Sequence, residues 1–307
     1  MHDSSQQALG QRALVTGGTG FIGSHLVEHL RAAGWVVHML VRPNGEHMAR
    51  PSAGVHIHPY RGQTADVIEA MELSRPDVVF HLASLFLAQH TAQQIVPLIE
   101  TNVLLGVQLL EAMSGAGVKS LVNTGTSWQH FHSDSYLPVN LYAATKQAFE
   151  DILAYYADAE GIHAVTLSLF DSYGPGDRRK KLLRLLLDCL ETNGELQMST
   201  GEQILDLVHV DDLCEAFLHA ARLVRDPKHP PMACYAVSGG ERMSLREIVA
   251  TLEQTAGRTL RIDWGARPSR PREVMHLWDG PAMPGWLPRI KLVDGLKALL
   301  NERSHCV

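Results

Sequence analysis

The stretch Thr16-Gly17-Gly18-Thr19-Gly20-Phe21-Ile22-Gly23 decides the fold of this chain. It follows an apolar run at 12–16 that is typical of a buried strand, and it opens a helical pattern that extends to Ala33. Its glycines at 17, 20 and 23 have the spacing of a dinucleotide-binding turn. The first glycine permits a tight turn, the second lets the backbone approach a pyrophosphate, and the third lets helix and strand pack closely. The flanking strand and helix favour this interpretation over an ordinary glycine-rich turn.

The next strand, expected at 35–41, ends on Arg42 and not on a carboxylate. An acidic residue at this point would bind the adenosine ribose hydroxyls of NAD, whereas a guanidinium makes charge-assisted hydrogen bonds to the 2′-phosphate of NADP. We therefore expect NADP(H) as the preferred cofactor, with NAD(H) as the alternative. A solvated turn residue before Pro43 is the other interpretation of Arg42.

Strand and helix patterns alternate through the first 170 residues. Buried strands are expected at 77–83, 119–124 and 163–170, and amphipathic helices at 93–113 and 141–159. This repeated strand-then-helix order predicts an α/β fold with a doubly wound parallel sheet, which is a Rossmann fold.

A turn-rich stretch, Ser-Tyr-Gly-Pro-Gly-Asp at 172–177, ends this alternation. Separate helices are expected after it, at 180–191, 212–223, 245–255 and 291–300. We therefore assign residues 1–170 to the NAD(P)-binding domain, and 171–307 mainly to a smaller C-terminal substrate-binding lobe. Segments within 204–237 are expected to return to the first domain.

Composition narrows the class of protein. The 307 residues are 45% hydrophobic, which suffices for a packed core, and the formal net charge is −6. No block of like charges suits a nucleic acid or an anionic membrane, so we expect neither partner. The first eleven residues form a polar tail without the pattern of a signal peptide, and no apolar run reaches the ~20 residues of a membrane span. Four scattered cysteines suggest no disulfide framework and fit a reducing cytoplasm.

The 17 histidines raise the question of a metal site. The pairs His130-x-His132 and His56-x-His58 have no acidic or cysteine ligand at a recognisable spacing. We therefore expect no metal, and we expect histidines near the site to serve as hydrogen-bond partners.

Tyr142 and Lys146 lie four residues apart in an expected helix, which places both on one helical face, one turn apart. A phenol with a pKa of about 10 is a poor acid or base at neutral pH. A neighbouring ammonium favours the ionised phenol, so we expect Lys146 to lower the pKa of Tyr142 into a useful range. Thr126 is the first candidate for a hydroxyl that hydrogen-bonds a substrate carbonyl beside Tyr142, and Ser127 is the second. Either hydroxyl could instead satisfy its own backbone.

Seven sequence motifs extend this pattern along the chain. They are TGGTGFIG (16–23), DVVFHLAS (77–84), ETNVLLG (100–106), NTGTSW (123–128), YAATK (142–146), LFDSYGPGD (169–177) and TGEQILDLVHVDDL (200–213). Together they resemble the extended short-chain dehydrogenase/reductase superfamily, and within it the NAD-dependent epimerase/dehydratase family, over residues 12–300. NTGTSW, YAATK and the last motif look most similar to the reductases that complete CDP-linked 3,6-dideoxyhexoses, such as CDP-abequose and CDP-paratose synthases.

The resemblance implies a role for each matching residue. Tyr142 would give a proton to the sugar keto oxygen, Lys146 would hold the nicotinamide ribose, and Thr126 would polarise the same oxygen. Asn102 would help to order the site. The residues expected to bind the cofactor are Gly17, Thr19, Gly20, Phe21, Ile22, Gly23, Arg42, Gln63, Leu82, Ala83, Ser84, Asn102, Tyr142 and Lys146. Substrate contacts are expected from Ser127, Gln129, Asp171, Arg178 and Arg272.

Three positions depart from the family pattern. Gln63 stands where the family has an aspartate, and its amide can still hydrogen-bond adenine. Ser127-Trp128 replaces the Asp-Glu pair with which dehydratases eliminate water, so dehydration is not expected. Leu205 stands where relatives carry an arginine for the substrate diphosphate. Its replacements, each of which could equally be a solvated surface charge, are Arg178, Arg179, Lys180, Arg270 and Arg272.

These observations favour an NADPH-dependent reductase acting on the keto group of a nucleotide-linked 4-keto-6-deoxyhexose or 3,6-dideoxyhexose. A 4-epimerase that uses the same residues on tightly held NAD⁺ is the first alternative. A non-catalytic NAD(P)-binding sensor is the alternative from another class, and a reductase of small ketones or flavonoid-type substrates would suit a site without the arginine at 205. The resemblance also implies a homodimer built on the two long helices that precede and contain the active-site residues.

Overall fold

Seven parallel strands form the central sheet of the protein, in the order β10-β6-β5-β4-β1-β2-β3. They are β1 (Arg12–Thr16), β2 (Val36–Val41), β3 (Val55–Pro59), β4 (Val78–His81), β5 (Ser120–Thr126), β6 (His163–Leu169) and β10 (Met232–Val237). This order, which reverses between β1 and β4, confirms the doubly wound sheet predicted from the sequence. The computed structural model describes residues 10–43 and 54–304, so most of the expected N-terminal tail lies outside the described residues.

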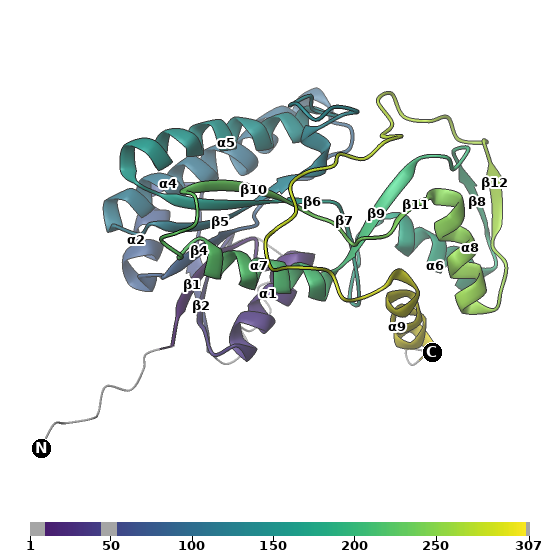
Figure 1. Ribbon diagram of the computed structural model, residues 1–307, viewed down its shortest axis with the longest axis horizontal. Coiled ribbons are helices and arrows are strands. Elements are labelled where there is room, and N and C mark those ends of the chain that lie inside the picture. The colour runs from purple at the N-terminus through teal and green to yellow at the C-terminus, as the bar shows by residue number, and fades with distance from the viewer. Residues whose placement is uncertain (1–9, 44–53, 305–307) are drawn as a thin grey trace, which may run out of the picture.

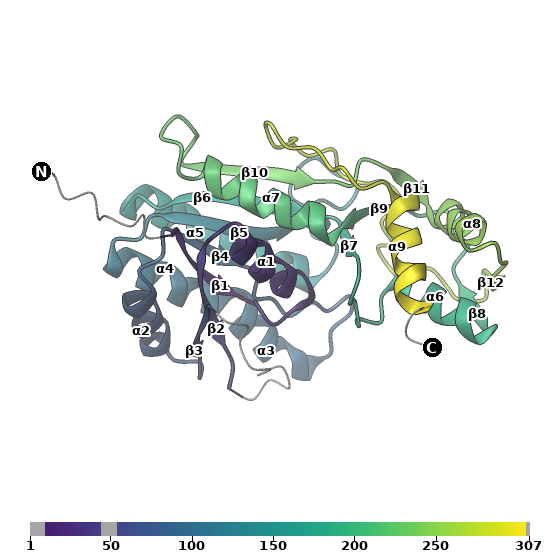
Figure 2. The same cartoon turned by 90° about the horizontal axis from the view of Figure 1, so that it is seen from below.

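Helices cover both faces of this sheet (Figures 1 and 2). One face carries α2 (Thr64–Ser74), α4 (Leu105–Ala116) and α5 (Leu141–Glu160). The other face carries α1 (Phe21–Ala32) and α7 (Val210–Leu223). The inner strands β1 and β4 are buried on both sides and are continuous apolar runs in the sequence, whereas the edge strand β3 is partly exposed.

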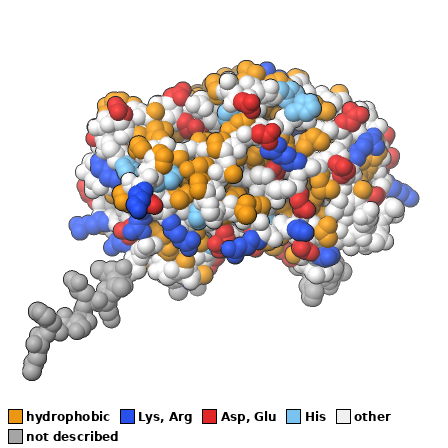
Figure 3. Space-filling model, viewed as in Figure 1, with side chains coloured by type: hydrophobic (Ala, Val, Ile, Leu, Met, Phe, Trp, Pro, Cys, Tyr) orange, Lys and Arg blue, Asp and Glu red, His pale blue; other side chains and the backbone are white. Residues whose placement is uncertain are grey.

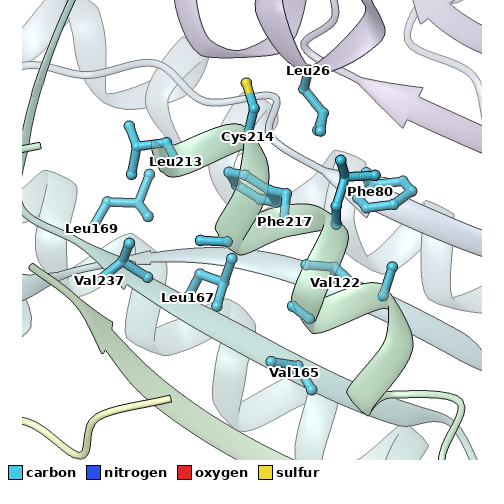
Figure 4. Packing of buried hydrophobic residues seen from close by; sticks show 14 of the residues in the cluster. Leu26, Phe80, Val122, Val165, Leu167, Leu169, Leu213, Cys214, Phe217 and Val237 are labelled. Carbon is cyan, nitrogen blue, oxygen red and sulfur yellow. The ribbon is translucent and has the colours of Figure 1, made fainter. Parts of the chain in front are cut away.

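Each face has its own hydrophobic core. Successive strand residues point to opposite faces, so Leu14 joins the core beneath α4 whereas Val15 joins the core beneath α1 and α7. Figure 4 shows Phe217 of α7 lying above strand side chains that include Val122 and Leu167. Burying a side chain as completely as Phe217 stabilises the fold by about 1.5–3 kcal/mol.

The helix predicted at 93–113 is not one regular α-helix. It consists of a 3₁₀ turn η1 (Ala92–Gln94), α3 (Ile95–Ile99), a π-turn η2 (Glu100–Leu104) and then α4. The wider π-turn buries Thr101 and Asn102, which are 6% and 1% exposed. Both side chains thereby come to lie near the carboxyl edge of the sheet.

The whole helical stretch Ala92–Ala116 is long and apolar enough to cross a membrane by length and composition, contrary to the expectation from the sequence. Half of its most apolar window is buried inside the protein. Its polar side chains also face inward: Gln108 accepts a hydrogen bond from the Tyr60 hydroxyl at 2.7 Å, and Asn102 donates to the Leu85 carbonyl at 3.1 Å. The stretch thus packs as a core helix of the sheet layer.

A smaller lobe is built from the second half of the chain (Figure 1). Two strands of the large sheet lead into it, because β6 is followed by β7 and β10 is followed by β11. Its strands are β7 (Asp171–Tyr173), β9 (Ile204–His209) and β11 (Arg242–Ser244) in one sheet, and β8 (Glu195–Met198) with β12 (Arg261–Trp264) in another. Its helices are α6 (Leu182–Thr192), α8 (Leu245–Ala256) and α9 (Leu292–Ser304). The functional division of the chain at residue 170 stays a prediction.

A segment without regular helix or strand, 265–291, crosses from the smaller lobe to the larger lobe and back (Figure 1). We call it the strap. The Met275 N–H donates to His132 Nε2 at 2.9 Å, and the Arg289 and Ile290 N–H groups donate to the Asp212 carboxylate. These hydrogen bonds fix the strap to the larger lobe.

Candidate active site

The glycine turn connects β1 to α1, and each glycine has its own steric reason. Gly17 has a φ of +72°, and a Cβ there would lie 2.6 Å from the backbone nitrogen of Ala83. A Cβ on Gly23 would overlap the carbonyl oxygen of Gly17. A Cβ on Gly20 would meet that oxygen alone among the described atoms, at 3.2 Å, so the backbone is open on its other side. An open backbone at Gly20 is what the approach of a pyrophosphate requires.

The start of α1 suits an anion. Thr19 and Gly20 are exposed, while Phe21 and Ile22 are partly buried. The first turn of α1 carries no acidic side chain. The positive end of the helix dipole and the free backbone N–H groups are therefore available to an anion. The guanidinium of Arg179 lies 4.3 Å from the centre of the Phe21 ring and brings a cation from the smaller lobe to this turn.

The loop after β4 packs directly on the glycine turn. The Leu82 N–H donates to the carbonyl of Thr16, and the Ala83 N–H donates to its hydroxyl, both at 3.2 Å. The next residue, Ser84, donates its hydroxyl hydrogen to Asn102 at 3.2 Å. Leu82, Ala83 and Ser84 therefore lie at the carboxyl edge between β1 and β4, where a doubly wound sheet binds its ligand.

Asn102 orders this loop through hydrogen bonds to its backbone and side chains. Its Oδ1 accepts hydrogen bonds from the Ser84 hydroxyl and the Leu85 N–H, and its Nδ2 donates to the Leu85 carbonyl and the Thr145 hydroxyl. These four bonds use the whole capacity of the amide. The π-turn buries this side chain beside the loop, and its contact with a cofactor stays a prediction.

Arg42 and Gln63 lie at the edge of the sheet where the adenosine half of a dinucleotide would bind. Arg42 is exposed at the end of β2, and one of its Nη atoms donates to the Thr101 hydroxyl at 2.8 Å. Gln63 is exposed and is the N-cap residue of α2. Their contacts with a cofactor stay predictions.

Tyr142 lies in the first turn of α5, where the side chain of the N-cap residue Asn140 accepts a hydrogen bond from the Ala143 N–H at 3.0 Å. The phenol is 8% exposed, and the hydroxyls of Ser84 and Thr126 lie near enough to stabilise its ionised form. The structure thus brings together the expected proton donor and the expected polarising hydroxyl from α5, β5 and the loop after β4.

Burial raises the pKa of Tyr142 to about 12, and its hydrogen bonds with Ser84 and Thr126 oppose this rise. The expected lowering of this pKa by Lys146 is not found, because removing the phenolate from water outweighs any attraction by the ammonium. The phenol therefore keeps its proton at neutral pH. A proton donor must do the same.

Lys146 lies one turn further along α5 and is 3% exposed. Burial lowers the pKa of its ammonium to about 8, and the Glu150 carboxylate opposes this. Within residues 10–43 and 54–304, the ammonium makes no hydrogen bond or ion pair. A buried cation without acceptors is costly. The ribose hydroxyls of a nicotinamide dinucleotide would supply such acceptors, so Lys146 and the open backbone at Gly20 both fit this cofactor.

Gln129, which was expected to contact the substrate, does not line the cleft between the lobes. It is 2% exposed, and its Oε1 accepts a hydrogen bond from the Thr126 N–H at 2.9 Å. Its Nε2 donates to Gln147 at 2.9 Å and to Glu150 at 3.1 Å. The 3₁₀ turn η3 (Ser127–Gln129) forms a capping box that folds this side chain back onto Thr126, and its contact with a substrate stays a prediction.

A cleft of about 1200 Å³ lies between the two lobes and the strap. Phe86 lines it, and its ring meets the ring of Tyr142 edge-on, with 5.0 Å between their centres. Trp128 lines the same side, 5.4 Å from Phe86. The expected substrate residues that line the cleft are Ser127, Asp171, Arg178 and Arg272. The cleft therefore ends beside the proposed proton donor.

The cations of the cleft differ in how free they are. Arg178 is exposed and has no hydrogen bond or ion pair within the part of the chain that the structure describes. Arg272 lies on the strap and donates to the carbonyls of Val139 and Pro138, at 3.1 and 2.8 Å. Lys180 and Arg270 also line the cleft.

Arg179 is the least free of the predicted diphosphate ligands. Its Nε and Nη2 donate to the Asp177 carboxylate at 2.7 Å each, and Nη2 also donates to the carbonyl and hydroxyl of Ser172. Leu205 lines the cleft and packs against the apolar core of the smaller lobe. The wall at this position is therefore apolar.

Sequence reasoning missed three residues of this site. Phe86 is 45% exposed in the cleft and follows the DVVFHLAS motif without any signal of its own. Lys181 pairs with Asp171 at 3.3 Å, and its ammonium lies 5.4 Å from the centre of the Phe86 ring. Glu150 follows Lys146 by four residues, so the helical period that joined Tyr142 to Lys146 was the signal that could have found it.

Several histidines contact other aromatic or imidazole side chains. His38 Nδ1 and His58 Nε2 are 2.9 Å apart on β2 and β3, and the His130 ring stacks on Trp278 with 4.0 Å between centres. No group of three or more His, Cys, Asp or Glu side chains among residues 10–43 and 54–304 is arranged to hold a metal ion.

The doubly wound sheet, the glycine turn and the tyrosine–lysine helix define a class: a nicotinamide-nucleotide-dependent enzyme of the short-chain dehydrogenase/reductase type. The NAD dependent epimerase/dehydratase family matches residues 13–233, and the chain belongs to it. The resemblance seen in the sequence motifs is thereby confirmed, and membership of a family of enzymes favours catalysis over the sensor alternative.

Relatives of this chain include CDP-abequose synthases and UDP-glucose 4-epimerases. It is 29% identical over 306 residues to the CDP-abequose synthase of Salmonella typhimurium (strain LT2), covering 96% of this chain and 99% of that protein. It is also 29% identical over 303 residues to the UDP-glucose 4-epimerase of Streptomyces lividans, covering 90% and 91%. Among solved structures, the UDP-glucose 4-epimerase of Thermus thermophilus in complex with NAD superposes with a TM-score of 0.82 at 26% identity, covering 97% of this chain and 100% of that one.

Proposed function

We propose that the protein uses NADPH to reduce the keto group of a nucleotide-linked 4-keto-6-deoxyhexose or 3,6-dideoxyhexose. One observation carries the proposal: the protonated Tyr142 phenol lies beside Thr126 and the cleft and has the buried Lys146 side chain one helical turn away. Similarity to a CDP-abequose synthase along nearly the whole chain supports a nucleotide sugar as substrate.

Each of three side chains has one task in this reaction. NADPH, when bound, supplies the hydride that adds to the keto carbon. Tyr142 gives its proton to the keto oxygen, which becomes the product hydroxyl. Thr126 accepts a hydrogen bond from the Trp128 N–H at 3.3 Å, so its own hydrogen is available to the same keto oxygen. Lys146 holds the ribose hydroxyls, and its charge stabilises the phenolate that remains.

The residues after Thr126 favour reduction over water elimination. Elimination needs a paired acid and base, and Ser127 and Trp128 at these positions carry no ionisable group near neutral pH. Ser127 lines the cleft and is 7% exposed, so it can only hydrogen-bond the sugar.

The substrate diphosphate is assigned to the cations of the cleft. Arg178 is unpaired within the described chain, and the strap holds Arg272 across the cleft from it. Lys180 and Arg270 line the same cleft, so four cations compensate for the apolar side chain of Leu205.

The test is NADPH oxidation against a panel of CDP-, dTDP-, GDP- and UDP-linked 4-keto-6-deoxyhexoses, followed by the near-ultraviolet absorbance of NADPH. We expect one nucleotide to be turned over at a rate typical of enzymes, about 1–1000 s⁻¹, and the others much more slowly. The matched control is the same sugar after its keto group has been reduced chemically. Equal background rates with every keto sugar would contradict the proposal.

A 4-epimerase is the second candidate, favoured by the similarity to UDP-glucose 4-epimerases in sequence and in structure. An epimerase uses the tyrosine in both directions and regenerates its cofactor in each cycle. Purified protein that retains oxidised cofactor and interconverts sugars without added NADPH would favour this candidate.

The preference for NADPH rests on Arg42. Arg42→Ala removes a cation from the end of β2, so we expect the affinity for NADPH to fall roughly ten- to hundred-fold and that for NADH to change little. Quenching or enhancement of cofactor fluorescence on binding measures both affinities. Arg258→Ala, an exposed arginine of the smaller lobe, is the control and should change neither. Equal loss of both cofactors, or no loss, would show that Arg42 does not read the 2′-phosphate.

We also propose that two copies associate through the helical layer formed by α3, η2 and α5. The apolar side chains exposed on it are Ile95, Val96, Ile99, Leu104 and Tyr155.

Acidic and basic side chains are interspersed on the face seen in Figure 3, which supports a small-molecule substrate in place of a polyanion. We place the enzyme in the cytoplasm, where NADPH and nucleotide sugars meet.

A further inference from the structure

A third ionisable side chain continues the line of Tyr142 and Lys146 along α5. Glu150 follows Lys146 by four residues and Tyr142 by eight, so the three side chains succeed one another at a spacing of about one helical turn. Glu150 is partly buried, and it and Lys146 act electrostatically on one another. The Lys146 ammonium therefore has a carboxylate one helical turn further along α5, and the two groups interact electrostatically.

Neighbours outside α5 hold this carboxylate in place. Gln129 donates from Nε2 to Oε1 of Glu150 at 3.1 Å. The other end of the same amide accepts the Thr126 N–H at 2.9 Å. A Cβ on Gly125 would lie 3.1 Å from Oε1, so the carboxylate packs closely against the end of β5 at a position with no side chain. One glutamine therefore links Glu150 to the residue that hydrogen-bonds Tyr142.

We infer that Glu150 and Gln129 are positioning residues for the proposed reduction: the Glu150 carboxylate keeps the Lys146 ammonium charged, and Gln129 fixes Thr126 relative to α5. The inference rests on the proposed function, because it explains how the same site keeps Lys146 protonated and Thr126 in place. The Gln129 amide is used by Thr126, Gln147 and Glu150, and Glu150 accepts one of these hydrogen bonds, so we assign both a role through other residues.

The groups around Glu150 are consistent with this assignment. On α5 these groups are Lys146 and the exposed Asp151. On β10, the thiol of Cys234 interacts with Glu150 and is hydrogen-bonded to the Ser168 hydroxyl at 3.3 Å.

Burial raises the pKa of Glu150 to about 7, while the hydrogen bond from Gln129 and the charge of Lys146 oppose this rise. Glu150 is therefore ionised at the pH values near 8 at which Lys146 loses its proton.

His81 of β4 faces Lys146 from the other side. Burial lowers its pKa to about 3, so it stays neutral and adds no competing charge. Among these groups, the Glu150 carboxylate is therefore the one that favours the charged form of Lys146.

Glu150→Gln removes the charge but keeps the size of the side chain, because the amide oxygen of the new glutamine can still accept the hydrogen bond from Gln129. Lys146 binds the cofactor ribose while it is charged, and it loses its proton as the pH rises through its pKa of about 8. Without the carboxylate the proton is lost more easily. We therefore expect the pH midpoint at which NADPH affinity declines to move about one unit lower. Fluorescence titration of NADPH across pH measures this midpoint.

Two further variants test whether the shift is specific. Glu150→Asp keeps the charge and is expected to retain most of the wild-type midpoint. Asp158→Asn removes the same charge from an exposed position of α5 and should leave the midpoint unchanged. Thermal unfolding of each variant establishes that it is folded. If Glu150→Gln does not fold, the pH midpoint of NADPH binding is still measured in Glu150→Asp.

The outcome is independent of sugar turnover. A midpoint in Glu150→Gln equal to that of the wild type, or a shift of the same size in Glu150→Asp, would overturn the inference. If the wild type binds NADPH but reduces no keto sugar, the proposed function fails, and the midpoint still decides the role of Glu150.

Discussion

Tyr142→Phe is expected to lower kcat for keto-sugar reduction by a factor of roughly a hundred to ten thousand, the usual contribution of general acid catalysis. The variant keeps the ring that meets Phe86 edge-on, but it has no proton to give to the keto oxygen. KM should therefore change little, because the lost interaction acts on the developing alkoxide and not on the bound ketone. Steady-state kinetics with NADPH and the preferred sugar measure both constants.

The matched control is Tyr155→Phe, which makes the same substitution on the same helix at a position that is 62% exposed. Its kcat should equal that of the wild type. Unchanged turnover in Tyr142→Phe would mean that another group, or water, protonates the product. Equal loss in both variants would point to a general effect on α5 and not to the chemistry of one phenol.

The larger lobe could be predicted from the sequence because its signals are local. The helix expected at 141–159 spans Leu141–Glu160, since Asn140 caps its start and Gly161, with a φ of +64°, follows its end. The strand expected at 163–170 spans His163–Leu169, since it is buried on both faces and mostly apolar, with Thr166 and Ser168 as buried polar residues.

Hydrogen bonds between distant residues set the limits of that prediction. Gln129 was expected in the substrate pocket, but its partner Glu150 lies 21 residues away on another element. Asn102 was expected at the cofactor, but a π-turn that no local pattern announces directs it to Leu85. The spacing of Tyr142 and Lys146 specifies a shared helical face and says nothing of how far burial raises the pKa of the phenol. Desolvation depends on the whole fold, so sequence spacing alone could not supply its sign.

Gly23→Ala is expected to destabilise the fold by about 3 kcal/mol and to abolish measurable NADPH binding. The added Cβ would overlap the carbonyl oxygen of Gly17, and a backbone atom cannot swing aside as a flexible side chain does. Either α1 moves away from β1, or the turn opens and its N–H groups lose their common direction. Thermal unfolding and cofactor fluorescence measure the two effects.

Gly20→Ala separates the cofactor from the fold at the same turn. The φ of −79° and ψ of 173° at Gly20 are ordinary for any residue, and a Cβ would contact the Gly17 oxygen at 3.2 Å, which a small shift relieves. We expect a loss of stability below about 1 kcal/mol but an at least tenfold loss of NADPH affinity, because the methyl group projects where the pyrophosphate approaches. Gly115→Ala, in an exposed part of α4 with no atom within 4 Å of the new Cβ, is the control and should stabilise the protein by about 0.5–1 kcal/mol without changing affinity. If Gly20→Ala binds NADPH like the wild type, the pyrophosphate does not lie on this turn; if it unfolds as readily as Gly23→Ala, the open side of Gly20 is a packing surface and not a binding one.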